Sequence, residues 1–213
     1  MNTDRLIDAL SARLEPADRG RVWRALAGAL IFGAAVAVGG MLAVLGLRTP
    51  MDMTRLGFLL AKLAFTVATL GLATVALVRL MRPGADGRRM LFLVAVPFLI
   101  VALCAVFSLA STHWTDWGSM ALGRQWLACL IFIPLLAVVP FAVLIWVLRT
   151  TGAPTDLARA GAIAGLLAGS VGATAYALHC PDDSLPFVAI WYGGTIALCT
   201  FIGAKLGPRL LRW

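Results

Sequence analysis

The sequence predicts an all-α membrane protein whose helices cross the bilayer six times. Hydrophobic residues make up 61% of the 213 residues and charged residues only 13%, whereas a soluble domain carries about 25% charged residues. About 20 consecutive apolar residues are enough to cross roughly 30 Å of hydrocarbon, and six such stretches occupy most of the chain. The sequence lacks the alternating ten-residue segments that are typical of a transmembrane β-barrel.

The six apolar stretches give the expected order of the helices. The first stretch follows a polar segment, residues 1–24, that is longer than the n-region of a signal peptide, so we expect this stretch to remain as an anchor. The chain then divides into a cytoplasmic head, residues 1–24, and a six-helix transmembrane domain, residues 25–213. The expected spans are about 25–47, 57–80, 90–110, 126–148, 159–179 and 186–206.

The distribution of positive charge predicts the orientation of these spans. The formal net charge is +8, and most of the 18 Lys and Arg residues lie on the same side of the membrane as the N-terminus. Cytoplasmic loops carry the excess of Lys and Arg, so we expect both termini in the cytoplasm. The seven tryptophans agree, because all of them fall near expected span ends. The positive charge is therefore a topology signal and does not indicate a nucleic-acid partner. The exceptions to the charge bias are Arg48, Arg55, Lys62 and Arg124.

In this orientation the segment HCPDDS, residues 179–184, lies outside the membrane directly after the fifth span. In a bacterium that compartment is the oxidising periplasm, in which disulfides persist. Cys129 lies about five residues into the fourth span, roughly 7 Å deep, so we expect it at a depth similar to that of Cys180. Cys104 and Cys199 lie within the third and sixth spans and are interpreted as small hydrophobic residues.

Cys129, Cys180 and the segment 179–184 form what we call the outer cluster, and the residues alone leave three interpretations of it open. In the first, the cysteines only pack, and Asp182 and Asp183 only solvate the turn that follows the fifth span. In the second, Cys129 and Cys180 form a redox-active pair, which requires their Cα atoms to lie within about 7 Å. In the third, a metal ion binds here.

The metal interpretation draws on both histidines of the chain. Cys129, Cys180 and His179, with His113 as a further candidate, offer the mixed sulfur and nitrogen ligands that suit soft or borderline ions such as zinc. Their spacing matches no standard metal-binding motif. His179 and His113 are therefore candidate accessory ligands to the two cysteines.

The scarcity of charged residues in the spans and the absence of enzyme motifs exclude several classes of function. Lys62 is the one charged residue that lies away from the ends of the expected spans, and we expect its side chain to snorkel to the interface. The absence of Asp and Glu from the spans counts against a proton-coupled transporter. The hydrolase, metalloprotease and P-loop motifs are missing, so we do not expect an enzyme. A small-solute transporter or channel, or a scaffolding membrane subunit, is the alternative function.

The fifth span carries a regular pattern of small residues. Gly161, Gly165 and Gly169 recur at four-residue spacing in GAIAGLLAG. Small residues on one face of a helix allow a neighbouring helix to approach closely. The pattern predicts tight packing of the helix that leads to Cys180.

Residues 2–15 are predicted to form a short amphipathic helix. Its apolar face binds either the membrane surface or a groove on a cytoplasmic partner. The near-balance of positive and negative charge in residues 1–24 disfavours electrostatic membrane binding, so we expect a partner. The residues of this face are Leu6, Ile7, Leu10 and Leu14.

Several stretches of the sequence resemble one family. That family is NrsF, whose members are six-span inner-membrane anti-sigma factors of Gram-negative bacteria. The similarity covers nearly the whole chain and is most specific from residue 124 onward. The stretches are RQWLACLIFIPLLAVVPFAVLIWVLRTTGAPTD (124–156), AGAIAGLLAGSVGATAYALHC (160–180), FVAIWYGG (187–194) and GPRLLRW (207–213).

The resemblance implies a function and two site residues. In the family, a short cytoplasmic N-terminal segment holds an extracytoplasmic-function sigma factor of the SigF type. Two periplasm-side cysteines are needed for the response to stress such as heavy metals, and they match Cys129 in WLAC and Cys180 in LHC. The resemblance thus implies an anti-sigma factor that releases its sigma factor when these cysteines sense metal or oxidative stress. It implies no cofactor beyond a transient metal ion or a disulfide at Cys129 and Cys180.

Overall fold

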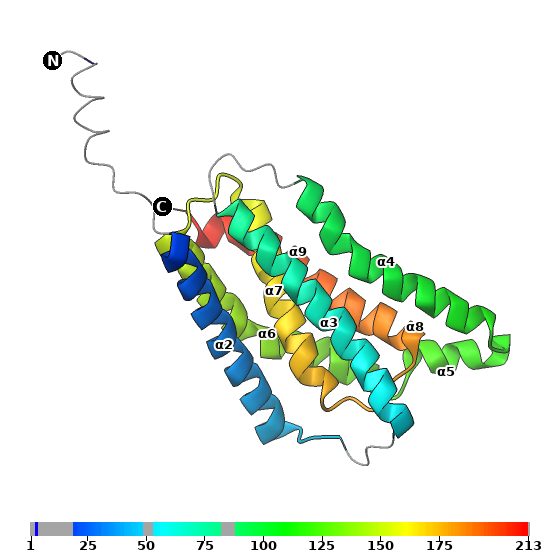
Figure 1. Ribbon diagram of the computed structural model, residues 1–213. Coiled ribbons are helices and arrows are strands. Elements are labelled where there is room, and N and C mark those ends of the chain that lie inside the picture. Colours follow the sequence, from blue (N-terminus) through cyan, green and yellow to red (C-terminus); the bar gives the residue numbers. More distant parts are fainter. Residues whose placement is uncertain (1–2, 4–18, 49–52, 82–87, 213) are drawn as a thin grey trace.

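The computed structural model describes residues 3, 19–48, 53–81 and 88–212 (Figure 1). Within these residues every regular element is helical, and six helices are long and apolar enough to cross a membrane. The predicted all-α fold with six candidate spans is therefore confirmed. The expected head helix over residues 2–15 falls outside the described residues except for residue 3, and so do all residues of its apolar face, namely Leu6, Ile7, Leu10 and Leu14.

The long helices overlap the expected spans, and their ends differ from the expected bounds by up to seven residues. α6 is preceded by the short helices η1 (Trp114–Asp116) and α5 (Trp117–Leu122). α9 is preceded by α8 (Leu185–Phe187) and by the π-helical turn η2 (Val188–Tyr192). The long helices are α2 (Arg19–Val44), α3 (Met53–Leu80), α4 (Arg88–Ala110), α6 (Trp126–Thr151), α7 (Leu157–Ala177) and α9 (Gly193–Leu210).

Helix α7 forms the centre of the bundle. The protein buries 89% of its apolar window, and α7 packs against α9, α6, α3 and α2. Its glycines face α9: a Cβ added at Gly161 would overlap the Gly203 carbonyl, and one added at Gly165 would overlap the Cys199 carbonyl. Gly169 lies against the Cys199 side chain. The absence of side chains at these positions lets the two backbones touch.

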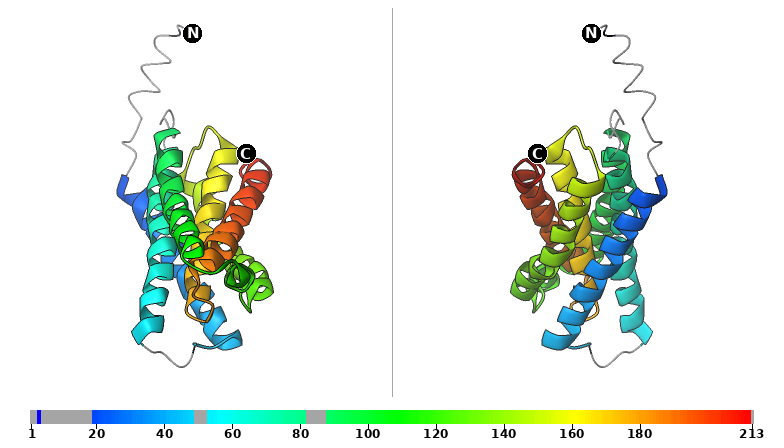
Figure 2. Two further views of the ribbon diagram at one scale, coloured as in Figure 1. Left: turned by 90° about the vertical axis from the view of Figure 1, so that its right-hand side faces the viewer. Right: turned by 90° about the vertical axis from the view of Figure 1, so that its left-hand side faces the viewer.

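The two ends of the bundle are formed by different segments of the chain (Figure 2). At one end, α2 begins and α3, α6 and α9 end, with Arg79, Arg149 and Arg209 in their last turns. At the other end lie the loop after α2, the segment around α5 and the loop after α7. We call this second end the loop end. The 26 residues of α2 run from one end to the other and span about 39 Å at 1.5 Å per residue.

Candidate functional site

Cys129 and Cys180 meet at the loop end. Cys129 lies in the first turn of α6, and Cys180 follows α7, where its N–H donates to the Tyr176 carbonyl over 3.0 Å. Both cysteines are fully buried, and their thiols are free and within hydrogen-bonding contact of each other. The other two cysteines are also free: Cys104 is exposed on α4, and Cys199 packs within α9.

The surroundings of Cys180 favour its thiolate form. A hydrogen bond from the Cys129 thiol is the largest influence, and it helps to lower the pKa of Cys180 from 9.0 to about 7. Burial opposes this change, while the nearby Lys62 ammonium and the backbone of Asp182 support it. The thiolate is the form that attacks oxidants and binds metal ions. Cys180 is thus the more reactive of the two thiols near neutral pH.

Both tyrosines of the chain border this thiol pair. The Tyr176 hydroxyl donates to Oε1 of Gln125 over 3.2 Å, and the Tyr176 ring stacks on Phe132. Tyr192 comes from η2, and π-helical turns are frequent at functional sites. Its buried hydroxyl lies beside the thiols, with the Cys180 thiol as its neighbour, and among the described residues it is the one buried side-chain oxygen or nitrogen without an oxygen or nitrogen partner.

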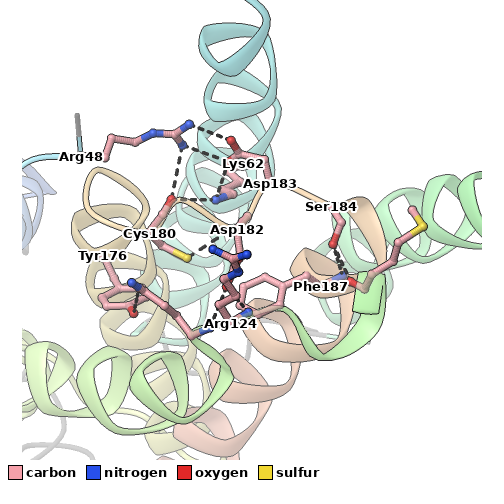
Figure 3. A network of polar contacts seen from close by, with 11 residues as sticks. Arg48, Lys62, Arg124, Tyr176, Cys180, Asp182, Asp183, Ser184 and Phe187 are labelled. Atoms are coloured by element: carbon pink, nitrogen blue, oxygen red, sulfur yellow. Dashed lines mark hydrogen bonds and ion pairs between the residues drawn. The ribbon is translucent and has the colours of Figure 1, made fainter. Parts of the chain in front are cut away.

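A buried ion cluster lies next to Cys180 (Figure 3). Arg48, after α2, makes a two-pronged contact with Asp183, with Nη1–Oδ1 at 2.9 Å and Nη2–Oδ2 at 2.7 Å. The Lys62 ammonium of α3 lies 2.7 Å from Oδ1 of the same carboxylate. Both cations also donate to the Cys180 carbonyl, over 3.3 Å from Arg48 and 3.1 Å from Lys62. The cluster therefore joins α2, α3 and the cysteine-bearing loop.

Two predictions about this cluster are wrong. The Lys62 ammonium does not reach water, because Asp183 and the Cys180 carbonyl hold it inside the protein. Asp183 does not merely solvate a turn, since it neutralises Arg48 and Lys62. Burial disfavours the Asp183 carboxylate, but hydrogen bonds from both cations outweigh burial and hold the pKa of Asp183 below its usual value. The hydrogen bond between Arg48 and Asp183 also raises the pKa of Arg48.

Asp182 is likewise an anchor and not a residue that only solvates a turn. Its Oδ2 accepts the N–H groups of Arg124 and Gln125 over 2.9 Å and 2.8 Å. These donors lie at the start of α6, where backbone N–H groups lack helical partners and a carboxylate complements the helix dipole. The Ser184 hydroxyl donates to the Met120 carbonyl in α5. The loop after α7 is therefore bonded to α5 and α6 as well as to α2 and α3.

The histidines do not complete a metal site with the thiols. Nδ1 of His179 lies 3.0 Å from the Gly46 carbonyl oxygen, and exposed His113 pairs with the Thr115 hydroxyl. The part of the chain that the structure describes holds no group of three or more His, Cys, Asp or Glu residues placed to bind a metal ion. Two adjacent thiols can still be oxidised to a disulfide or hold one soft metal ion between two thiolates.

Comparisons with known proteins identify the family. Residues 10–213 match the NrsF family, described as negative regulator of sigma F. The chain belongs to this family. It is 36% identical over 222 residues to the anti-sigma-F factor NrsF of Caulobacter vibrioides and 32% identical over 214 residues to the probable anti-sigma-F factor NrsF of Azospira oryzae. Both alignments cover 100% of each chain. No solved structure matches the chain.

The sequence reasoning brought the two cysteines together but missed the groups that surround them. Arg48, Asp183 and Tyr192 were not expected at the site. One signal was available: an ionisable residue inside a span implies a buried partner. Lys62 met that condition, and the nearest carboxylates on the outer side included Asp183.

Proposed function

We propose that the protein is an anti-sigma factor of the bacterial inner membrane that releases its sigma factor when Cys129 and Cys180 react. The observation that carries this proposal is the contact between two buried free thiols, one from α6 and one from the loop after α7. The partner would be an extracytoplasmic-function sigma factor of the SigF type, held by residues 1–24. The signal would be a periplasmic oxidant or a soft metal ion.

The charge pattern of the bundle supports the orientation that this proposal needs. Arg79, Arg149, Arg159 and Arg209 lie at the end of the bundle where α2 begins, opposite the loop end. By the positive-inside rule we assign that end to the cytoplasm, with the thiols on the periplasmic side and residues 1–24 in the cytoplasm. The thiols would then face the oxidising compartment, while the head faces the transcription machinery.

The head itself supports a protein partner through its pattern. Leu6, Ile7, Leu10 and Leu14 share one helical face, as in peptides that lay an apolar stripe into a groove. Relatives named anti-sigma-F factors align over the full chain, head included. We therefore assign the sigma contact to this face.

Either signal would change the thiol pair by balanced chemistry. An oxidant takes two electrons, two protons leave the thiols, and an Sγ–Sγ bond forms between Cys129 and Cys180. A soft metal ion instead displaces the two protons and bonds to both thiolates. The Cβ atoms of a disulfide lie about 3.8 Å apart with a narrow range of dihedral angles. Each product thus imposes a new geometry on the loop after α7.

The cysteine part of the proposal is tested with a sigma-dependent reporter. Cells carry wild type, Cys129→Ser, Cys180→Ser or the matched control Cys104→Ser, and receive diamide as the oxidant or a cadmium salt as the soft metal. We expect Cys104→Ser to respond as wild type and the other two to lose the response. Diamide response alone would identify an oxidant sensor, and cadmium response alone a metal sensor. A full response in both Cys129→Ser and Cys180→Ser would refute the sensor.

The head is tested by co-purification with the sigma factor. Leu10→Asp places a charge in the apolar face and is expected to abolish co-purification. Ala12→Asp places the same charge on the opposite face of the predicted helix and is expected to leave binding intact. Retention of the sigma factor after deletion of residues 1–20 would exclude this segment as the binding site.

A further inference from the structure

The end of α2 is bonded to the loop that carries Cys180. α2 ends at Val44, and Gly46, with φ of 74°, turns the chain toward the end of α7. Beyond the turn, the Arg48 N–H donates to the Leu178 carbonyl over 3.2 Å. The Gly46 carbonyl oxygen lies 3.0 Å from Nδ1 of His179. These two contacts to backbone carbonyls join the segment after α2 to the segment after α7 without any charged side-chain pair.

The Arg48 guanidinium adds the charged part of this contact. It holds Asp183 by two hydrogen bonds of 2.9 Å and 2.7 Å and reaches the Cys180 carbonyl at 3.3 Å. Only 4% of the Arg48 side chain and 14% of the Asp183 side chain are exposed. A two-pronged Arg–carboxylate pair fixes both distance and orientation. Loss of one partner of such a buried pair is strongly destabilising, unlike loss of a surface pair. We call the Arg48–Asp183 pair the clasp.

From the clasp, α2 leads without interruption to the opposite end of the bundle. It runs from Arg19 to Val44, and residues 1–18 directly precede it. Along the way it packs against α6 and α7, and a Cβ at Gly33 would lie 3.0 Å from the Pro140 backbone. Rigid helices that pack closely are the elements through which distant sites couple. The geometry connects the outer thiols with the chain segment before α2 through one helix.

We propose that the clasp transmits the state of the Cys129–Cys180 pair to α2 and through α2 to the sigma-binding head. This inference rests on the proposed function. The clasp is intact while both thiols are free, and it holds α2 in the position that binds the sigma factor. Disulfide formation moves the loop after α7, which weakens the bonds between Asp183 and Arg48. A signal can shift the equilibrium between the sigma-binding and sigma-releasing positions of α2 only through bonds that differ between these two states. The clasp is such a set of bonds.

The chain supplies a matched control for this route. Lys62 donates to the same Asp183 carboxylate and the same Cys180 carbonyl as Arg48, but it comes from α3. Lys62→Gln therefore weakens the loop without cutting its bond to α2. Arg48→Gln removes the charged bond to α2 and leaves the backbone bonds in place, while Lys62 continues to neutralise Asp183 and to support the fold. Arg48→Lys keeps the charge and is the conservative variant.

The test uses the full-length protein in lipid nanodiscs, in complex with its sigma factor. Gel filtration measures the free sigma factor before and after addition of diamide, whose N=N bond accepts the two electrons and two protons of the thiols. For Arg48→Gln we expect about a tenfold rise in released sigma factor before diamide, equal to about 1.4 kcal/mol, and little further release afterwards. Lys62→Gln is expected to stay near wild type, and Arg48→Lys to restore most of the retention. Mass spectrometry is expected to show the Cys129–Cys180 disulfide in every variant.

Three outcomes separate this inference from the proposed function. Wild-type retention and a full diamide response in Arg48→Gln would overturn the clasp. Equal release from Lys62→Gln and Arg48→Gln would also overturn it, because loop stability and not the bond to α2 would then control release. Diamide-driven release from both Cys129→Ser and Cys180→Ser would instead refute the proposed function. A folded state is verified for each variant by its elution as a single species and by its melting temperature.

Discussion

The Lys62 ammonium lies 2.7 Å from Oδ1 of Asp183, and only 1% of the lysine side chain is exposed. Lys62 belongs to a candidate span, Leu56–Leu80, whereas Asp183 lies in the loop after α7. A charge inside a membrane costs about 2.5–3.5 kcal/mol on insertion scales, so the lysine depends on its carboxylate. The pair also holds α3 against the loop that carries Cys180, and it does so beside the thiols.

Removal of the Lys62 charge is expected to destabilise the protein without unfolding it. Lys62→Met loses the ion pair and the hydrogen bond to the Cys180 carbonyl, while Asp183 keeps Arg48 as a partner. We expect a loss of about 1.5–3 kcal/mol in unfolding free energy, the range for hydrogen bonds to charged groups. Thermal unfolding in detergent measures it, with exposed Lys205→Met as a control within about 0.5 kcal/mol of wild type. A Lys62→Met protein as stable as wild type would contradict the prediction.

The Asp183 carboxylate is expected to make stability depend on acid. Its pKa is lowered below 3.8 in the folded protein, because the bonds from Arg48 and Lys62 outweigh burial. A group with a lowered folded pKa contributes stability above its unfolded pKa of about 3.9 and loses it as pH falls through the folded value. The melting temperatures of wild type and Asp183→Asn should therefore differ at pH 6 and converge as pH falls below about 4. A constant difference from pH 3 to pH 7 would show that another group is responsible.

The sequence predicted the features that depend on local patterns. Span lengths follow from runs of apolar residues, and the face of α7 that packs against α9 follows from glycines at four-residue spacing. Both can therefore be predicted from the sequence alone. The clasp could not be predicted from the sequence, because Arg48 and Asp183 lie in two loops distant in sequence and neither belongs to a periodic pattern. The π-helical turn that aims Tyr192 at the thiols also has no simple sequence signal. A charged residue in a loop is expected to lie in water, but neighbouring helices bury Arg48 and most of Asp183.

The two tyrosines offer a matched pair of substitutions. Tyr192→Phe removes a buried hydroxyl that has no oxygen or nitrogen partner and only the Cys180 thiol, a weak partner, beside it, and a poorly bonded hydroxyl costs about 1–3 kcal/mol to bury. We expect Tyr192→Phe to keep or raise the unfolding free energy. Tyr176→Phe loses the bond to Gln125 and is expected to cost about 1 kcal/mol. If Tyr192→Phe proved the more damaging change in thermal unfolding, its hydroxyl would have to bond to a thiol.

The contact between α7 and α9 is expected to tolerate no added methyl group. In Gly165→Ala the new Cβ would overlap the Cys199 backbone carbonyl, which cannot rotate away. Overpacking of this kind costs about 1–3 kcal/mol. Gly28→Ala in α2 is the control, since its Cβ would meet no atom within 4 Å, and alanine is favoured over glycine in helices by about 0.5–1 kcal/mol. Equal melting temperatures for the two variants would show that α7 and α9 are not in backbone contact.

The Cys129 thiol is expected to set the pH at which Cys180 becomes reactive. Its hydrogen bond is the largest cause that lowers the pKa of Cys180 from 9.0 to about 7. Since the thiolate is the nucleophile, modification of Cys180 by methyl methanethiosulfonate should reach half its maximal rate near pH 7. Cys129→Ala removes the donor, so the midpoint should move upward toward 9.0. Mass spectrometry of the Cys180 peptide measures the rate, and Cys199→Ala should leave the midpoint unchanged. An unmoved midpoint in Cys129→Ala would instead assign the lowered pKa of Cys180 to Lys62, the Asp182 backbone and Tyr192.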